Sequence, residues 1–311
     1  MQKFIIRRIL YSFLLLWIVM SLSFVLVHIA PGGPERTLMA NPRITQEDMD
    51  RLRESYGLND PIWVQYWRWL SGVITFNFGI SYKQNTAVIR VIGERIWPTL
   101  QLGLFSYIIG LIGIPLGIYA AKRRGRLGDN LVQVLTVVGS AMPAWWLGLM
   151  VIIILSNTVG WFPQGQGGSS VGDWLLHLLI PSALLATTFI VVFTRFVRSE
   201  TLEVLSQDYV RTAHSKGLPP SLVSQRHVLR NALIPVVTLF GSFLPTVVSG
   251  ALITEIIFNW PGMGRLFFES AYARDYPVVM TILLITTAFT IIGTLLADLA
   301  YAWVDPRIHY S

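Results

Sequence analysis

The chain has 311 residues, of which 53% are hydrophobic and only 13% are charged. Soluble globular domains carry about twice that share of charge, so the composition excludes an ordinary soluble domain and predicts an integral membrane protein. The formal net charge of +7 does not indicate nucleic-acid binding, because the basic residues gather in clusters beside apolar segments. The absence of cysteine excludes disulfides, thiolate metal sites and thiol nucleophiles.

Six apolar segments are long enough to cross a bilayer, since about 20 helical residues span a hydrocarbon core of roughly 30 Å. A soluble protein that buried helices so apolar on every face would need a polar shell that the rest of the chain cannot supply. We therefore predict an all-α integral membrane protein with six transmembrane helices. The expected spans are residues 9–30, 100–121, 131–156, 174–197, 233–257 and 278–303.

The first span follows Lys3, Arg7 and Arg8, as the apolar part of a secretory signal would. Its hydrophobic stretch is too long for a signal peptide, and residues 27–31 make a poor small-x-small cleavage site. We expect an uncleaved first transmembrane helix.

The distribution of basic residues predicts the orientation. Lys and Arg cluster before the first span, after the second span and between the fourth and fifth spans, whereas the connection 157–173 has none. The positive-inside rule then places both termini and the segment 198–232 in the cytoplasm, and the segment 31–97 outside. The residues in the three clusters are Lys3, Arg7 and Arg8; Lys122, Arg123, Arg124 and Arg126; and Arg198, Arg211, Lys216, Arg226 and Arg230.

The segment 31–97 carries helix signals of its own. Thr45 and Asp48 form a capping-box pair, and Gly57 is placed to end the helix that they begin. Asp60 and Pro61 predict the N-cap and first turn of a second helix, which is rich in Trp and Tyr, and an amphipathic stretch at 88–97 leads into the second span. Dense aromatic residues are typical of the headgroup layer, so we interpret the segment as a structural cap and not as a substrate site.

The segment 198–232 predicts a helix, a sharp turn and a second helix. Leu202, Leu205, Tyr209 and Ala213 recur at helical spacing. Gly217, with two prolines soon after it, is a helix stop, and Ser221 can cap the helix that follows. The small residues Ala213 and Gly217 lie one turn apart, which predicts a face that a partner can approach closely. This pattern alone is also compatible with an ordinary loop.

No catalytic constellation is present. The chain has no Gly-Lys dipeptide and hence no P-loop, and it has no His-Glu-x-x-His metal motif. Residues 168–172 match the Gly-x-Ser-x-Gly pattern, but no strand precedes them, so we interpret the match as chance. We predict a protein that is not an enzyme and that binds no metal or cofactor of its own.

Ionisable residues within the membrane would indicate an ion-coupled carrier, because charge at bilayer depth is costly and is usually functional. The candidates His28, Arg195, Glu255 and Asp298 lie near the ends of spans and form no evident relay. An ion-gradient-driven secondary transporter or channel remains the alternative from another functional class.

Residues 208–219 resemble the EAA loop of ABC importer permeases in its peptide-transporter form. Arg211, Thr212 and Ala213 take the places of Glu-Ala-Ala, and Gly217 matches the glycine of the motif. Residues 227–230 depart from the Ile-x-Leu-Pro that usually follows. Further segments are similar to the first permease subunit of dipeptide and oligopeptide importers, in order along nearly the whole chain: residues 30–34, 56–61, 78–82, 255–264, 273–277 and 305–307.

The resemblance implies a type I ABC importer permease in a prokaryotic cytoplasmic (inner) membrane. Residues 1–97 would form the first transmembrane helix and an extracytoplasmic helical segment, and residues 98–311 a five-helix core. The chain would form half of an alternating-access pathway for peptides, with oligosaccharide, nickel or glutathione as alternative substrates. Its partners would be a second homologous permease, two cytoplasmic ATPase subunits that hold ATP and Mg, a solute-binding protein and membrane lipid, but no nucleic acid.

A short helix at 211–218 would be the coupling helix of such an importer. The residues that the resemblance assigns to ATPase coupling are Asp208, Tyr209, Val210, Arg211, Thr212, Ala213, His214, Ser215, Lys216, Gly217 and Leu218.

Overall fold

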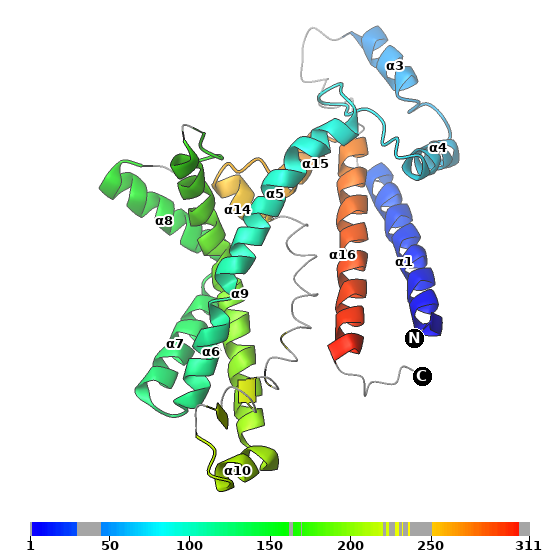
Figure 1. Ribbon diagram of the computed structural model, residues 1–311. Coiled ribbons are helices and arrows are strands. Elements are labelled where there is room, and N and C mark those ends of the chain that lie inside the picture. Colours follow the sequence, from blue (N-terminus) through cyan, green and yellow to red (C-terminus); the bar gives the residue numbers. More distant parts are fainter. Residues whose placement is uncertain are drawn as a thin grey trace. The chain divides into compact units, whose positions relative to one another are not determined.

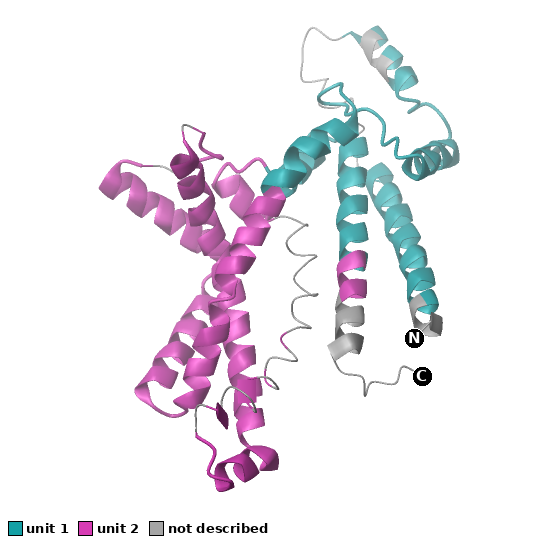
Figure 2. Ribbon diagram, viewed as in Figure 1, with its two compact units in different colours: residues 1–98, 262–291 teal, residues 99–261, 292–311 magenta. Residues whose placement is uncertain are grey.

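The computed structural model of the protein describes residues 2–29, 45–161, 164–168, 170–219 and 251–304, with six single positions between 222 and 236. Within these ranges the regular structure is helical, apart from one isolated bridge between Ile80 and Ala87 (Figure 1). The chain divides into two compact units. Figure 2 shows Met1–Pro98 with Gly262–Ile291 as the first unit, and Thr99–Pro261 with Ile292–Ser311 as the second.

The first unit brings segments from both ends of the sequence together. It holds the helices α1 (Gln2–Ile29), α3 (Gln46–Ser55), α4 (Ile62–Ile74) and α15 (Met263–Tyr272), the start of α5 (Val88–Gly110) and the first part of α16 (Tyr276–Val304). Val88 and Ile92 of α5 pack against Met263 of α15 and Val278 of α16. A second cluster joins Phe24 of α1 to the start of α16 and to aromatic residues of α4.

The second unit is built around the longest helix. It holds the rest of α5, then α6 (Gly113–Lys122), α7 (Leu127–Ala141), α8 (Ala144–Val159), α9 (Val171–Leu205), α10 (Asp208–Ser215) and α14 (Leu252–Ile257). Gly113 and Gly117 lie against the backbone of α9, where an added Cβ would come within 2.5 Å of the Ile190 carbonyl oxygen and 2.7 Å of the Thr194 carbonyl oxygen. These glycines therefore let α6 and α9 pack at backbone distance, as small residues do between membrane helices.

The predicted helices of the segment 31–97 are present in its described part, with one error at a cap. Helix α3 ends as expected, since Gly57 has a φ of +65° and its N–H donates to the Glu54 carbonyl oxygen at 3.0 Å. The assignment of Asp60 as the N-cap of α4 is wrong. The N-cap is Pro61 in an extended conformation, and the Asp60 carboxylate instead accepts a hydrogen bond from Arg68 at 2.6 Å, because a guanidinium offers it a charged donor. The predicted stretch 88–97 is the first part of α5, which runs on through Pro98.

In the described part of the chain, four helical segments are long and apolar enough to cross a membrane: Ile6–Ile29, Val88–Lys122, Val171–Leu205 and Tyr276–Leu296. They correspond to the predicted first, second, fourth and sixth spans. Most of the predicted fifth span, 233–257, falls outside the described residues, and α14 is its described end.

The predicted third span, 131–156, is sharply bent. Helices α7 and α8 meet there at 94° and together form a broken span or a re-entrant loop. The break lies at Met142, which is extended with a ψ of 120°, and at Pro143. A proline disfavours the helical conformation in the residue before it and has no N–H to continue the helical hydrogen bonds, so this pair ends α7.

Candidate functional site

The segment that the sequence assigns to coupling is α10 and the turn that follows it. Helix α9 continues eight residues beyond the predicted end of the fourth span and leads to α10 through Ser206 and Gln207 (Figure 1). Residues 202–213, which carry the helical spacing, are divided between α9 and α10. The N–H groups of Ser206 and Gln207 donate to carbonyl oxygens only three residues back, and Gln207 is extended with a ψ of 146°, so the chain turns before α10 begins.

One face of α10 is buried against its own surroundings. Val210 and Ala213 are 2% and 5% exposed, and they cluster with Val223 and Val228. Partly buried apolar side chains on either side of α10 complete the cluster: Val204, Leu205 and Leu218. The expectation that Ala213 presents a small surface to a partner is therefore wrong, because this side chain packs within the chain. The cluster fixes α10 on the end of α9 by apolar contact.

The C-terminus of α10 is a Schellman motif, which confirms the helix stop predicted at Gly217. Gly217 has a φ of +75° and its N–H donates to the His214 carbonyl oxygen at 3.0 Å. The N–H of Leu218 donates to the Ala213 carbonyl oxygen at 3.4 Å, and the Leu218 side chain joins the apolar cluster. This pair of hydrogen bonds with an apolar contact is the usual way a left-handed glycine ends a helix.

The opposite face of α10 is exposed and polar, with one aromatic residue. Asp208 and Arg211 approach to 3.8 Å with side chains that are 97% and 76% exposed, a pair that contributes little to stability. Tyr209 is an exposed aromatic residue beside them. The other exposed members of the predicted coupling set are Thr212, His214, Ser215, Lys216 and Gly217. This face can meet a protein partner through polar contacts around one aromatic side chain.

A buried ion pair ties the start of α7 to α9 above this region. Arg198 donates from Nε and Nη2 to the two carboxylate oxygens of Asp129, at 2.7 Å and 2.8 Å. The N–H of Gly125 donates to the same carboxylate at 2.9 Å. A bidentate pair of this kind fixes both position and orientation, so the end of α9 that leads to α10 has a defined place on α7.

A second polar centre lies in the first unit and joins two segments that are 194 residues apart. Asp275 is 1% exposed, and its carboxylate accepts hydrogen bonds from the Ser81 hydroxyl and from the N–H groups of Tyr82, at 3.0 Å, and Lys83, at 3.3 Å. Burial and the Asp275 carboxylate raise the pKa of Tyr82. Both segments resemble importer sequences, but nothing in the sequence indicates that they touch.

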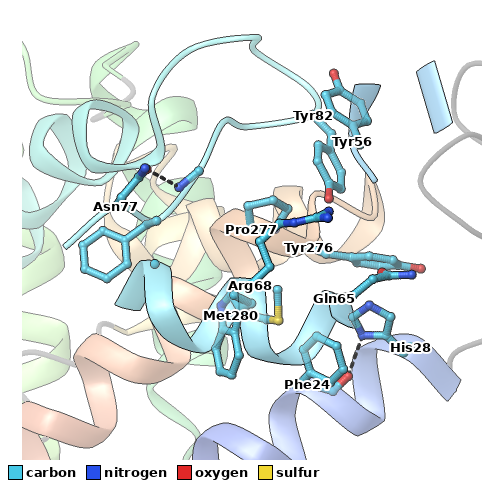
Figure 3. A pocket seen from close by; sticks show the side chains of 14 residues that line it. Phe24, His28, Tyr56, Gln65, Arg68, Asn77, Tyr82, Tyr276, Pro277 and Met280 are labelled. Carbon is cyan, nitrogen blue, oxygen red and sulfur yellow. Dashed lines mark hydrogen bonds between the residues drawn. The ribbon is translucent and has the colours of Figure 1, made fainter. Parts of the chain in front are cut away.

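A pocket of about 280 Å³ lies beside this centre, within the same unit (Figure 3). Aromatic side chains from α1, α4 and α16 line it, with Gln65 and Arg68 of α4 as polar members. The Tyr56 and Tyr82 rings stack at 4.3 Å between centroids on one side. Arg68 is paired with Asp60, so the pocket carries no unpaired cation from that residue.

Two of the ionisable residues considered for ion coupling, His28 and Glu255, have local hydrogen-bond partners. His28 bonds through Nδ1 to the Phe24 carbonyl oxygen at 2.8 Å, and Glu255 accepts from the Thr99 hydroxyl at 3.1 Å. Arg195 is exposed. The side chain of Asp298 lies outside the described residues.

The Gly-x-Ser-x-Gly match belongs to a helix start. The hydroxyl oxygen of Ser170 accepts the N–H of Asp173 at 3.1 Å and so caps α9. Across the described ranges, no group of three or more His, Asp and Glu side chains is arranged to hold a metal ion.

Comparison with known proteins identifies the family to which the chain belongs. The model of the family described as "Binding-protein-dependent transport system inner membrane component" matches residues 113–310, and the model of its N-terminal part matches residues 1–103. The chain is 43% identical over 317 residues to the oligopeptide transport system permease protein AppB of Bacillus subtilis. It is 37% identical over 313 residues to the glutathione transport system permease protein GsiC of Escherichia coli K12, and each comparison covers 100% of both chains.

Solved structures of ABC transporters share the fold. The MetNI methionine ABC transporter in an inward-facing conformation matches with a TM-score of 0.57 and 18% identity, over 70% of this chain and 97% of that chain. An amino acid ABC transporter determined with histidines matches with a TM-score of 0.51 and 14% identity, over 69% and 94%.

Proposed function

Since the chain belongs to the family of binding-protein-dependent transport system inner membrane components and is a permease of an ABC importer, we propose that α10 is the helix through which separate ATPase subunits move it. The observation that supports this is the division of α10 into two faces. Val210 and Ala213 fasten it to the end of α9, while Tyr209 and the polar side chains around it are exposed. A rigid helix held in this way can convert a rigid-body movement of a partner into a movement of the membrane helices.

In the proposed importer, ATP is hydrolysed by other subunits and not by this chain. The chain has no P-loop, so ATP and Mg would bind to two cytoplasmic ATPase subunits. A second homologous permease would complete the pathway, and a solute-binding protein would deliver the substrate from outside. In this arrangement both termini and α10 lie in the cytoplasm of a prokaryote, as the basic clusters predict.

Peptides are the proposed substrates. Relatives similar over their full length are named for oligopeptide and glutathione transport. We propose transport by alternating access, in which this chain supplies half of the pathway and no covalent chemistry. Membership of an ABC family favours ATP as the energy source over an ion gradient.

The test of the coupling proposal is a substitution on the exposed face of α10. Tyr209→Ser should weaken co-purification of the ATPase subunits and reduce substrate-stimulated ATP hydrolysis, because it removes the aromatic side chain that a partner would cover. Tyr272→Ser is the matched control, since Tyr272 is an exposed tyrosine of α15 in the other unit. Equal effects of the two substitutions would contradict the proposal.

Dependence on partners gives a second test. Vesicles that contain this chain alone should neither hydrolyse ATP nor accumulate peptide. Vesicles that also contain the ATPase subunits, the second permease and the binding protein should do both. Peptide accumulation by the chain alone would contradict an ATP-driven importer.

A further inference from the structure

Four basic residues gather in the turn between α6 and α7. Lys122, Arg123, Arg124 and Arg126 occupy four of five consecutive positions, and all are exposed. None of them takes part in an ion pair with a carboxylate in the ranges that the structure describes. The turn therefore presents four positive charges to its surroundings.

The nearest carboxylate is already occupied. Asp129 follows the turn, but it is 2% exposed and is held by both Nε and Nη2 of Arg198. Its remaining contact is the N–H of Gly125 at 2.9 Å, which shapes the turn. Since Arg198 is the ion-pair partner of Asp129, the four exposed cations of the turn can accept an anion from outside the chain.

The position of the turn at the membrane surface indicates which anion can reach it. The apolar segment Val88–Lys122 ends at the first of the four cations, so the cluster lies where a span leaves the hydrocarbon. Leu127, which follows the turn directly, is 81% exposed, and Leu131 is exposed one turn further along α7. Headgroups of the neighbouring leaflet lie at the level of the cations, and acyl chains can lie along these leucines.

We propose that the α6–α7 turn binds the phosphate headgroup of an anionic phospholipid. The Arg123 guanidinium is fixed in position by Tyr119. Its Nη1 donates to the Tyr119 hydroxyl at 2.6 Å, and the guanidinium lies 4.5 Å from the centre of the Tyr119 ring. The space beside Gly125 is open, since an added Cβ there would meet no atom within 4 Å. The positive charge of the turn, its position at the membrane surface and the exposed leucines of α7 together fit a phospholipid better than a soluble anion.

The site goes beyond the transport function and does not depend on ATPase coupling. It requires only that the chain is embedded in a membrane. Basic residues at this position also serve the orientation of the chain during insertion. That role ends once the protein is inserted, whereas a lipid site acts on the inserted protein, so the two are separable by experiment.

The experiment uses the natural absence of cysteine in the chain. Leu127→Cys carries a fluorophore, and the full chain is reconstituted into phosphatidylcholine vesicles that contain spin-labelled phosphatidylglycerol or spin-labelled phosphatidylcholine. Quenching should report at least about fivefold enrichment of phosphatidylglycerol at the label, since a single Lys or Arg near the surface contributes about 1 kcal/mol of attraction. Val171→Cys is the matched control, because Val171 is 76% exposed at a helix start next to a connection without Lys or Arg. It should show no preference.

Substitutions and added salt test whether the positive charge of the turn causes the lipid preference. Replacing all four basic residues by Gln should abolish the preference, and replacing the three arginines by Lys should retain it. The enrichment at Leu127 in the unaltered turn should also fall as chloride is added, because exposed charges are screened. This salt series keeps the proposal testable if the Gln variant fails to fold. Phosphate at the same ionic strength as chloride should have no additional effect.

Three results would overturn the proposal. Equal quenching by the two lipids at Leu127 would show that no anionic lipid is selected. Displacement by inorganic phosphate alone would assign the turn to a soluble anion. Loss of the preference in the assembled importer would show that a protein subunit, and not lipid, covers the turn.

Discussion

The junction between α9 and α10 is held by apolar side chains, whereas the junction between α15 and α16 is held by a buried carboxylate. At the first, Val210 and Ala213 pack on a small cluster while the rest of α10 is exposed. At the second, Asp275 accepts three hydrogen bonds from the loop that begins at Ser81. Both junctions connect two helices through a short turn.

The two kinds of contact, apolar packing and hydrogen bonds to a carboxylate, determine which junction can move. Apolar contacts are not directional, so a helix held by them can shift slightly without losing all of its stabilisation. A buried carboxylate with three donors has one good geometry, and an unmade bond leaves a desolvated polar group. We therefore expect α10 to transmit movement and the Asp275 junction to remain fixed.

The largest expected effect is on the fixed junction. Asp275→Asn removes the charge from three hydrogen bonds and places an amide NH₂ beside N–H donors, so we expect a loss of about 3 kcal/mol in the free energy of unfolding. Thermal unfolding of the purified chain in detergent measures it, and proteolysis within residues 79–87 should accelerate. Asp208→Asn is the control, because the Asp208 side chain is 97% exposed and its loss should cost less than about 0.5 kcal/mol. Similar losses from both substitutions would remove the contrast between the junctions.

The next effect is on the end of α10. Gly217→Leu places a side chain at a φ of +75°, which should cost about 1 to 2 kcal/mol. The variant should insert and still bind the loaded solute-binding protein, yet lose association with the ATPase subunits. A Cβ at Gly217 would meet no atom of this chain within 4 Å, so the cost inside the chain is conformational.

Gly160 provides a matched control for this substitution. It ends α8 at a φ of +65° with no atom within 4 Å of an added Cβ, so Gly160→Leu should cause a similar loss of stability and leave ATPase association intact. If Gly217→Leu left ATPase coupling intact and changed which solutes are transported, the assignment of α10 would be wrong.

A smaller effect depends on pH. Burial and Asp275 raise the pKa of Tyr82 above its usual value of 10.0, so the folded chain keeps this proton after the unfolded chain loses it. The stabilisation is complete below pH 10 and falls as the pH rises further, by about 1.4 kcal/mol per pH unit. Unfolding free energies measured from pH 9 to 11 should fall as the pH rises, Tyr82→Phe should make this fall less steep, and Tyr272→Phe should not. An unchanged slope in Tyr82→Phe would contradict the burial of this phenol.

The smallest expected effect is on an exposed ion pair beside the pocket. Asp60 and Arg68 approach to 2.6 Å, but their side chains are 40% and 58% exposed, so Asp60→Asn should cost less than about 1 kcal/mol. The same unfolding assay measures it, and added salt should reduce the difference. A loss comparable to that of Asp275→Asn would show that exposure does not separate the two carboxylates.

Sequence patterns predicted the parts of the fold that depend on neighbouring residues. The long apolar segments of α1, α9 and α16 are helices, and Gly217 ends α10, because hydropathy and a left-handed glycine act within a few turns. The broken pair α7 and α8 was missed because hydropathy is continuous across Met142 and Pro143, and a proline within a membrane helix can bend the chain without breaking it.

Contacts between distant segments could not be predicted. Nothing near Asp275 in the sequence indicates that its carboxylate binds the loop at Ser81, since 194 residues separate them. The spacing of Ala213 and Gly217 indicates a face with small side chains, but it cannot say whether that face meets a partner. In the structure Ala213 meets Val223 and Val228 instead. We therefore propose the face that carries Tyr209 as the coupling surface.

Photo-cross-linking from α10 in the assembled importer tests the central proposal most directly. A benzophenone amino acid at Tyr209, on the exposed face of α10, should cross-link to an ATPase subunit, and the same amino acid at Tyr272 should not. Cross-links from Tyr209 to the solute-binding protein, or to no subunit while Tyr272 captures the ATPase, would contradict the assignment of α10 as the coupling helix.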